Sequence, residues 1–276
     1  MNAQSVLLPA IQDLKTAGVQ DPVKDARLLL AHCMGVDADR LTLHLHDDVA
    51  ERDVERFLVL VRQRLQRQPV SQILGRRQFY GREFKVTPDV LDPRPETETL
   101  VERALNVGFL TVLDIGTGSG CLLLSLLAER QDAKGVGVDI SDVALRVAKE
   151  NANLVECAPR AKFVKSNWFA KVDGKFDLIV SNPPYIDEAE WLALEPEPRD
   201  WEPKIALTPG PDGVAPYRIL ASNAAEYLNE DGWLMVEIGW EQGPTVKAVL
   251  EKAGWLNVLV KQDLGGRDRV VLSQKP

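Results

Sequence analysis

In the first part of the chain, hydrophobic positions recur three and four residues apart, which is the spacing of a helix that buries one face. The clearest stripe lies in a strongly charged segment and consists of Val54, Phe57, Leu58, Val61 and Leu65. Another begins after Asp21-Pro22, a good cap and first-turn pair. We therefore predict a small helical domain over residues 1–75. A two-stranded ribbon over residues 76–92, turning near Gly81, is expected to connect it to the rest of the chain.

From Thr111 onward, apolar runs of strand length alternate with segments of helical period. The predicted strands cover residues 111–115, 134–140, 161–166, 175–181, 232–239, 257–262 and 269–274, and the helices 121–129, 141–153, 217–228 and 245–253. This alternation predicts a domain at residues 93–276 with a mostly parallel, doubly wound, seven-stranded α/β sheet. Ligands bind such sheets beyond the carboxyl ends of the strands. The sequence EPEPRDWEP, residues 195–203, predicts a stiff loop rather than a helix.

Composition narrows the class of protein without identifying it. The chain of 276 residues is 45% hydrophobic and carries a net charge of −8, from 33 basic and 41 acidic residues (33 − 41 = −8). This balance argues against a protein that coats nucleic acid. The three scattered cysteines form neither a disulfide framework nor a zinc site. Because no signal peptide or membrane span is visible, we expect a cytoplasmic protein that does not bind membranes. We also expect a monomer without a stable nucleic-acid partner.

A glycine-rich loop follows the first predicted strand of the second domain. It runs Gly116-Thr117-Gly118-Ser119-Gly120, and glycines at alternate positions let the backbone turn tightly and approach a ligand. Alone, the loop is equally consistent with an ordinary strand-to-helix turn. Its spacing also differs from the G-x-G-x-x-G of dinucleotide enzymes.

Asp139 ends the next strand, where an acidic side chain commonly holds the two hydroxyls of a ribose. A helix cap is the alternative role, but Ser141 is better placed for it. No Lys or Ser/Thr follows the glycines as it does in a P-loop. Loop and acid together therefore favour a nucleoside without a triphosphate, and S-adenosylmethionine is such a ligand.

The stretch IVSNPPYID, residues 179–187, ends another strand in an amide, two prolines and an aromatic ring. Asn182 offers a side-chain carbonyl and Pro183 a backbone carbonyl, while Pro184 has no N–H with which to fold the loop back on itself. Tyr185 is expected to flank a planar amide. The tetrapeptide alone also fits a merely rigid turn. Together with the glycine loop and Asp139, it predicts two fixed acceptors for an NH2 group beside a nucleoside.

VLDIGTGSG, VDIS and SNPPY together resemble the class I S-adenosylmethionine-dependent methyltransferases that modify amino or amide nitrogens. Longer tracts are similar to the PrmC/HemK family over almost the whole chain: LDPRPETE, SNWF, PDGVAPY, EIGWEQG and GGRDRVV. This resemblance implies a Rossmann-like methyltransferase sheet. It also implies transfer of a methyl group to the side-chain nitrogen (N5) of the glutamine in the GGQ motif of class 1 peptide chain release factors, with S-adenosylhomocysteine as product.

The resemblance also implies roles for particular residues. Catalysis would rest on Asn182, Pro183, Pro184 and Tyr185, and cofactor binding on Gly116, Thr117, Gly118, Ser119, Gly120, Asp139, Asn167, Trp168 and Asn182. Asn167 stands where the family usually has Asp. Trp168 would line the adenine end of the cofactor pocket, with a place in the core as the alternative. We expect no metal site, and the helical domain would recognise the protein partner.

Other interpretations stay open at this point. A sister enzyme that methylates a glutamine of a large-subunit ribosomal protein shares NPPY, whereas PRPETE favours the release-factor enzyme. A DNA adenine methyltransferase would need a basic channel and base flipping. A nucleotide-binding module without catalysis would not need Asn182 and Tyr185. Thr97 and Glu98 are expected to cap and charge the helix that begins near Pro95.

Overall fold

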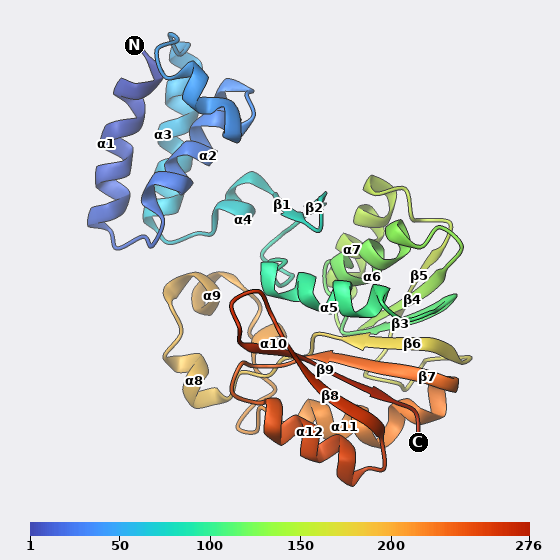
Figure 1. Cartoon of the computed structure of the whole chain (residues 1–276). Coiled ribbons are helices and arrows are strands. Elements are labelled where there is room, and N and C mark those ends of the chain that lie inside the picture. Colours follow the sequence, from blue (N-terminus) through green and yellow to red (C-terminus); the bar gives the residue numbers. More distant parts are fainter. The chain divides into compact units, whose positions relative to one another are not determined.

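Figure 1 shows the computed structural model of the protein, which describes all residues 1–276. The chain divides into two compact units. The first comprises residues 1–75 together with residues 195–201, and the second comprises residues 76–194 and 202–276. No helix in the structure is both long enough and apolar enough to cross a membrane.

The first unit is helical, as predicted. Its N-terminal elements are α1 (Ala3–Thr16), α2 (Pro22–Met34), η1 (Ala38–His44), α3 (Glu51–Leu65) and α4 (Val70–Leu74). Pro22 occupies the first turn of α2, where its missing N–H costs nothing, and Gly35 ends that helix in the left-handed conformation. The apolar stripes meet in a core whose fully buried members include Leu14, Leu29, Leu30, Leu41 and Phe57.

Residues 195–203 are not the stiff loop that the sequence predicted. Pro196–Trp201 form the helix α9, which begins at a proline because the first-turn N–H groups of a helix need no intrahelical partner. The segment belongs to the helical unit. Glu197 accepts hydrogen bonds from Arg64 Nη2 at 2.8 Å and from Arg67 Nη2 at 2.6 Å, and the Trp201 indole donates to the carbonyl of Gln66. These long-range contacts give a short, acidic sequence a helical conformation that its local pattern does not predict.

The second unit begins with the expected ribbon. Strands β1 (Arg76–Phe79) and β2 (Arg82–Lys85) pair antiparallel. Both turn residues, Tyr80 and Gly81, have positive φ, which matches the twist of a two-residue hairpin turn.

The seven-stranded, mostly parallel sheet is confirmed. Its strands are β3 (Thr111–Ile115), β4 (Lys134–Asp139), β5 (Ala161–Lys165), β6 (Phe176–Ser181), β7 (Leu228–Glu237), β8 (Leu256–Gln262) and β9 (Asp268–Gln274). Their order is β5-β4-β3-β6-β7-β9-β8, with β9 antiparallel to both of its neighbours. The chain builds outward from β3 through β4 to β5 and then restarts at β6 on the other side, so β3 and β6 form the switch point.

Helices cover both faces of this sheet (Figure 1). One face carries α5 (Glu98–Leu105), α6 (Cys121–Glu129) and α7 (Asp142–Leu154), and the other carries α11 (Ala215–Asn223) and α12 (Gly243–Lys252). The remaining short helices are η2 (Pro95–Thr97), α8 (Glu188–Leu192), α10 (Lys204–Leu207) and η3 (Ala224–Tyr227). Each face buries its own apolar cluster, exemplified by Leu123 on one side and Leu220 on the other.

Arg64 is the buried centre of the contacts that hold α9, because it also donates to Asp25 Oδ2 at 2.7 Å. Replacing Arg64 with Ala leaves two largely buried carboxylates, Asp25 and Glu197, without this cation. We expect the change to lower the free energy of unfolding of the helical unit by about 3–5 kcal/mol. Arg62→Ala, an exposed position on the same helix, is the matched control and should change it by less than about 0.5 kcal/mol. Native-state hydrogen exchange of α1 to α3 measures both effects, and equal protection in the two variants would contradict the assigned role.

Candidate active site

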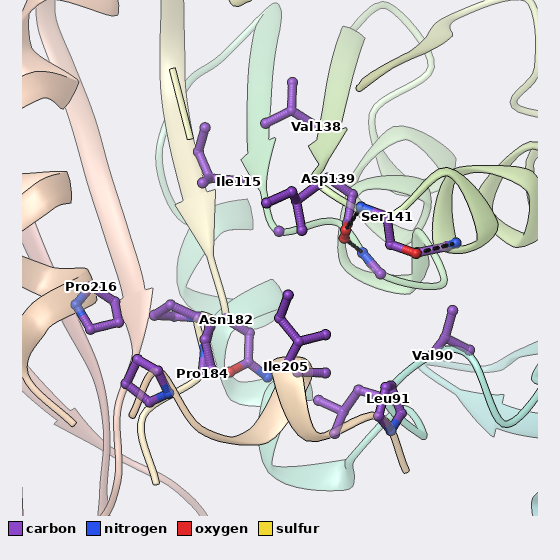
Figure 2. Close-up of a pocket in the computed structure, with 18 of the residues that line it drawn as sticks. Val90, Leu91, Ile115, Val138, Asp139, Ser141, Asn182, Pro184, Ile205 and Pro216 are labelled. Carbon is purple, nitrogen blue, oxygen red and sulfur yellow. Dashed lines mark hydrogen bonds between the residues drawn. The ribbon is translucent and has the colours of Figure 1, made fainter. Parts of the chain in front are cut away.

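A cavity of about 550 Å³ opens at the carboxyl ends of β3, β4 and β6. Its lining comes from six segments, at residues 88–91, 115–118, 138–144, 166–168, 182–184 and 203–219. Figure 2 shows Asp139 at the end of β4 and Asn182 and Pro184 beyond β6, with Ile205 between Asn182 and Leu91. The residues predicted from three separate strand ends therefore meet at one cavity.

The glycine loop connects β3 to α6 in a conformation that its sequence requires. Gly116, Gly118 and Gly120 have φ of +74°, +55° and +80°, values that L side chains rarely adopt. The first two line the cavity, and a Cβ on either would point into open space. Gly120 packs against Ala148 and is not part of the lining of this cavity. Thr117 and Ser119 are buried behind the loop and border a small side pocket that also includes Asn182.

Asp139 fixes the glycine loop as well as facing the cavity. Its Oδ2 accepts from the N–H of Gly118 and its Oδ1 from the N–H of Ser141, both at 2.9 Å (Figure 2). Burial raises the pKa of this carboxyl, and the backbone hydrogen bonds partly offset the rise. Ser141 caps α7 as predicted, by accepting from the N–H of Ala144. Each Asp139 oxygen retains lone pairs that could accept from a ribose hydroxyl.

A second carboxylate, Asp114, lies beneath the loop and was not singled out from the sequence. It is almost fully buried, and its Oδ2 accepts from the Thr117 hydroxyl at 2.7 Å. Burial raises the pKa of Asp114 to about 7, with the Thr117 hydrogen bond opposing and the nearby charge of Asp139 adding to the rise. Its position inside a strand of apolar residues reads in sequence only as an interruption of the hydrophobic run.

Asn182 and the two prolines lie together at the cavity edge. The Asn182 Nδ2 donates to the hydroxyl of Thr97 at 3.2 Å. The expectation that Thr97 caps a helix is wrong, because its side chain makes no cap hydrogen bond and is committed to Asn182 instead. The Glu98 carboxylate likewise reaches outside its helix, where it accepts from the N–H of Tyr80.

Tyr185, which was expected to flank an amide, is not among the residues that line the cavity. Its ring packs against the apolar cluster around α11 and β7, and its hydroxyl donates to Glu237 Oε1 at 3.2 Å. Its carbonyl oxygen accepts from the Gln242 side chain at 3.0 Å. The sequence did not identify Glu237 or Gln242, although both belong to the EIGWEQG tract that carried the family resemblance.

Asn167 and Trp168 line the same cavity as Asp139. Trp168 has a φ of +51°, and its carbonyl accepts from the Ser166 hydroxyl at 2.8 Å, which holds this unusual turn in place. Phe169, the next residue, is buried in the core instead. Trp168 also packs against the same core cluster, so it borders both the cavity and the core.

Arg94 and Glu202 form a further pair that the sequence did not predict. Arg94 Nη2 lies 2.6 and 2.8 Å from the two carboxylate oxygens of Glu202. Burial raises the pKa of Glu202 to about 7, and the charge of Arg94 partly offsets it. The pair joins the PRPETE tract to the segment that carries Pro203 and Ile205 along the cavity wall.

Comparisons with known proteins find relatives over the whole chain. A family model for the PrmC N-terminal domain matches residues 5–75, and one for the methyltransferase small domain matches residues 92–193. The release factor glutamine methyltransferase of Cereibacter sphaeroides is 49% identical, covering 100% of this chain and 99% of that protein. Those of Rhodospirillum rubrum and Agrobacterium fabrum are 44% and 39% identical, over 95% and 96% of this chain and 82% and 94% of their own. The chain belongs to the release factor glutamine methyltransferase family.

Solved structures extend the comparison to the fold of this family member. A methyltransferase from Pyrococcus furiosus superposes with a TM-score of 0.53 at 19% identity, over 70% of this chain and 88% of that one. The hMettl16 catalytic domain superposes with a TM-score of 0.58 at 15% identity, over 82% of each chain. Both confirm the methyltransferase fold that the resemblance implied, and the expected family membership is confirmed as well.

The raised pKa of Asp114 predicts how stability depends on pH in this methyltransferase. Because the folded value of about 7 lies above the ordinary 3.8, its contribution is fully present below pH 3.8 and is lost as the pH rises through 7. The Asp114→Asn variant has no carboxyl at this position and does not lose stability in this way. Between pH 4 and 8, its free energy of unfolding should therefore rise relative to that of the parent by on the order of a few kcal/mol. Denaturant titrations at several pH values measure the difference, and a difference that stays constant with pH would contradict the assignment.

Proposed function

We propose that this protein transfers the methyl group of S-adenosylmethionine to the side-chain amide nitrogen of the glutamine in the GGQ motif of class 1 release factors. The observation that carries the proposal is that Asn182 and Pro183 border the same cavity as the glycine loop and Asp139. A planar amide held by the first pair would lie beside a nucleoside held by the second. Relatives named release factor glutamine methyltransferase, similar over the full chain, support this choice of substrate.

The residues at the cavity fit S-adenosylmethionine. Gly116 and Gly118 leave their side of the cavity open, the Asp139 oxygens can accept from ribose hydroxyls, and Trp168 offers a ring for the adenine. The apolar wall that Val138 and Val143 provide suits the flat faces of a nucleoside. When bound, this cofactor supplies an electrophilic methyl carbon on a positively charged sulfur.

The protein's own task is to activate a poor nucleophile. An amide nitrogen shares its lone pair with the carbonyl, and this delocalisation is strong enough to give peptide bonds a rotation barrier of about 18–20 kcal/mol. The Asn182 side-chain oxygen and the Pro183 carbonyl would accept the two NH2 hydrogens, which orients the nitrogen and favours the positive charge that grows during attack. Fixed placement in such a reaction supplies up to about 7–11 kcal/mol. No base is needed before attack, and the product cation then loses a proton to water.

Asn182→Ala removes one of the two acceptors while leaving the glycine loop and Asp139 in place. We expect turnover to fall roughly 100-fold or more, by analogy with the loss of one group that stabilises transition-state charge, and the affinity for S-adenosylhomocysteine to change far less. Labelled methyl transfer to release factor and calorimetric titration of the product cofactor measure the two quantities. Turnover equal to that of the parent would refute the assigned role.

The substrate is tested by incubating the protein with labelled S-adenosylmethionine and, separately, release factor, a large-subunit ribosomal protein, DNA and a short GGQ peptide. Mass spectrometry should place the methyl on the GGQ glutamine of the intact factor. Because we propose that the helical unit recognises the partner, the peptide should be methylated with a much higher KM. A methyl group on the ribosomal protein or on adenine, with none on release factor, would contradict the proposal.

A further inference from the structure

A set of polar side chains, most of them buried, lies behind the NPPY segment, and neither cofactor binding nor the two acceptors account for them. Thr97 comes from η2, Glu237 and Gln242 come from the end of β7 and the turn after it, and Tyr217 comes from α11. Thr97, Glu237 and Tyr217 are each at most 3% exposed. Buried polar groups are costly unless they are hydrogen-bonded, so their gathering at one loop calls for a specific role.

Thr97 decides which end of the Asn182 amide is free. A side-chain amide has a donor end and an acceptor end that are almost identical in shape, so only its partners fix which way it points. The Thr97 hydroxyl receives the Nδ2 end at 3.2 Å. Because the Nδ2 end is bound to Thr97, the Oδ1 end is free to accept a hydrogen bond from a ligand. Asn182 is itself part of the cavity lining. If the hydroxyl donated instead, the amide would turn over and present a donor to the substrate's NH2.

Glu237 decides whether the Thr97 hydroxyl accepts. An ionised carboxylate has only acceptors, so a hydroxyl beside it must give up its proton and offer its lone pairs elsewhere. The Thr97 hydroxyl is one of the groups that lower the pKa of the Glu237 carboxyl. Oε1 accepts from the Tyr185 hydroxyl, whereas Oε2 is buried and has no hydrogen-bond partner. An ionised Glu237 would draw the Thr97 proton toward itself, which agrees with a Thr97 hydroxyl that accepts from Asn182.

Gln242 holds the other end of Tyr185. Its Nε2 donates to the Tyr185 carbonyl at 3.0 Å, and its Oε1 is occupied by the N–H of Gly239 at 3.0 Å. The Tyr217 hydroxyl lies 2.9 Å from the Glu237 carbonyl and 3.3 Å from Gln242 Oε1, and with one proton it donates to the nearer. A Cβ at Gly213 would lie 2.4 Å from the Tyr185 carbonyl oxygen. The PDGVAPY tract therefore needs glycine at this position to pack against the backbone of Tyr185.

We propose that Thr97 and Glu237 are positioning residues that orient the Asn182 amide with its oxygen toward the substrate, while Glu237 and Gln242 fix Tyr185 at both ends. This inference rests on the proposed function for its chemistry and on the hydrogen bonds above for its geometry. It assigns one task to three tracts of the chain that are distant in sequence. All of them converge on the two residues that flank Pro183 and Pro184.

We call the side chains of Asn182, Thr97, Glu237, Tyr185 and Gln242 the network. If Glu237 orients Asn182 through Thr97, turnover depends on the charge of Glu237. Burial raises the pKa of Glu237 to about 7, while Thr97, Arg269 and Tyr185 lower it and Glu96 raises it further. Tyr217 and Cys121 are the other titratable groups that face it, and burial raises the pKa of each, so both stay neutral near pH 7. A protonated Glu237 would donate to Thr97 and reverse the chain of hydrogen bonds. Turnover is therefore expected to fall as the pH drops through about 7.

The test compares Thr97→Val, which removes the hydroxyl at nearly constant shape, with Thr97→Ser, which restores it. Thr97→Val should lower kcat on release factor by about tenfold, as expected for one lost hydrogen bond, and leave S-adenosylhomocysteine affinity within about threefold. Thr97→Ser should recover most of the loss. Thr99→Val, buried two residues further along and outside the network, is the control and should match the parent.

The Glu237→Gln variant tests the pH dependence of kcat, which would not change if Glu237 had only a structural role. It should lower kcat and abolish the rise of kcat between pH 6 and 8. The inference is overturned if Thr97→Val turns over like the parent, if Thr97→Ser is as impaired as Thr97→Val, or if Glu237→Gln keeps the parent's pH profile.

A second measurement separates this inference from the proposed function. The side-chain NH2 resonances of Asn182 in ¹⁵N-labelled protein report its hydrogen bonding without any turnover. They should titrate near pH 7 in the parent and not in Thr97→Val or Glu237→Gln. A parent that methylates no release factor but shows this titration would contradict the proposed function and leave the network standing. Resonances that do not titrate would overturn the network itself.

Discussion

The meeting of β3, β4 and β6 at one edge of the sheet is the constraint on which the rest of this protein depends. Because the chain leaves β3 in one direction and returns to the other side at β6, a crevice can open at the carboxyl ends of these strands. Three short loops can therefore lie open beside one another. The glycine loop, the turn after Asp139 and the NPPY segment occupy these positions, and one cavity runs along all three.

Each loop is held by hydrogen bonds, and most of the groups that make these bonds do not line the cavity. Asp139 joins the loop after β4 to the glycine loop through the N–H of Gly118. Asn182 and Tyr185 are held by Thr97, Glu237 and Gln242. The wall that contains Pro203 and Ile205 begins at Glu202, which Arg94 anchors. A site assembled in this way is rigid where a poor nucleophile must be aligned, because its groups are fixed by hydrogen bonds before any ligand arrives.

The segment after NPPY serves both units of the chain. It runs through α8, contributes α9 to the helical unit, and returns at Glu202 to form a wall of the cavity. The helical unit is therefore not a simple N-terminal appendage, since its ion pairs include residues that lie between the NPPY segment and the cavity wall. This shared segment gives a physical connection between the unit proposed to bind the partner and the loop proposed to hold its glutamine.

Local patterns predicted the features of this protein that depend on local physics. Strand and helix periods gave the sheet, positive φ explains why Gly116 and Gly118 are glycines, and proline chemistry identified the stiff segment after Asn182. Local patterns could not predict which residues far apart in the sequence pair with one another. α9 is helical because Arg64 and Arg67 bind it. Thr97, which the sequence suggests as a helix cap, accepts a hydrogen bond from Asn182 instead. Such residues carry no periodic signal, so only coordinates reveal their partners.

The central claim is that two fixed oxygens receive the NH2 group of a glutamine side chain. A crystal structure with S-adenosylhomocysteine and a GGQ peptide tests it most directly. Our account predicts the glutamine nitrogen within hydrogen-bond distance of both Asn182 Oδ1 and the Pro183 carbonyl, about 2.7–3.2 Å, with the sulfur on its open side. A glutamine amide bound elsewhere, or an Asn182 amide that turns its nitrogen toward the peptide, would contradict it.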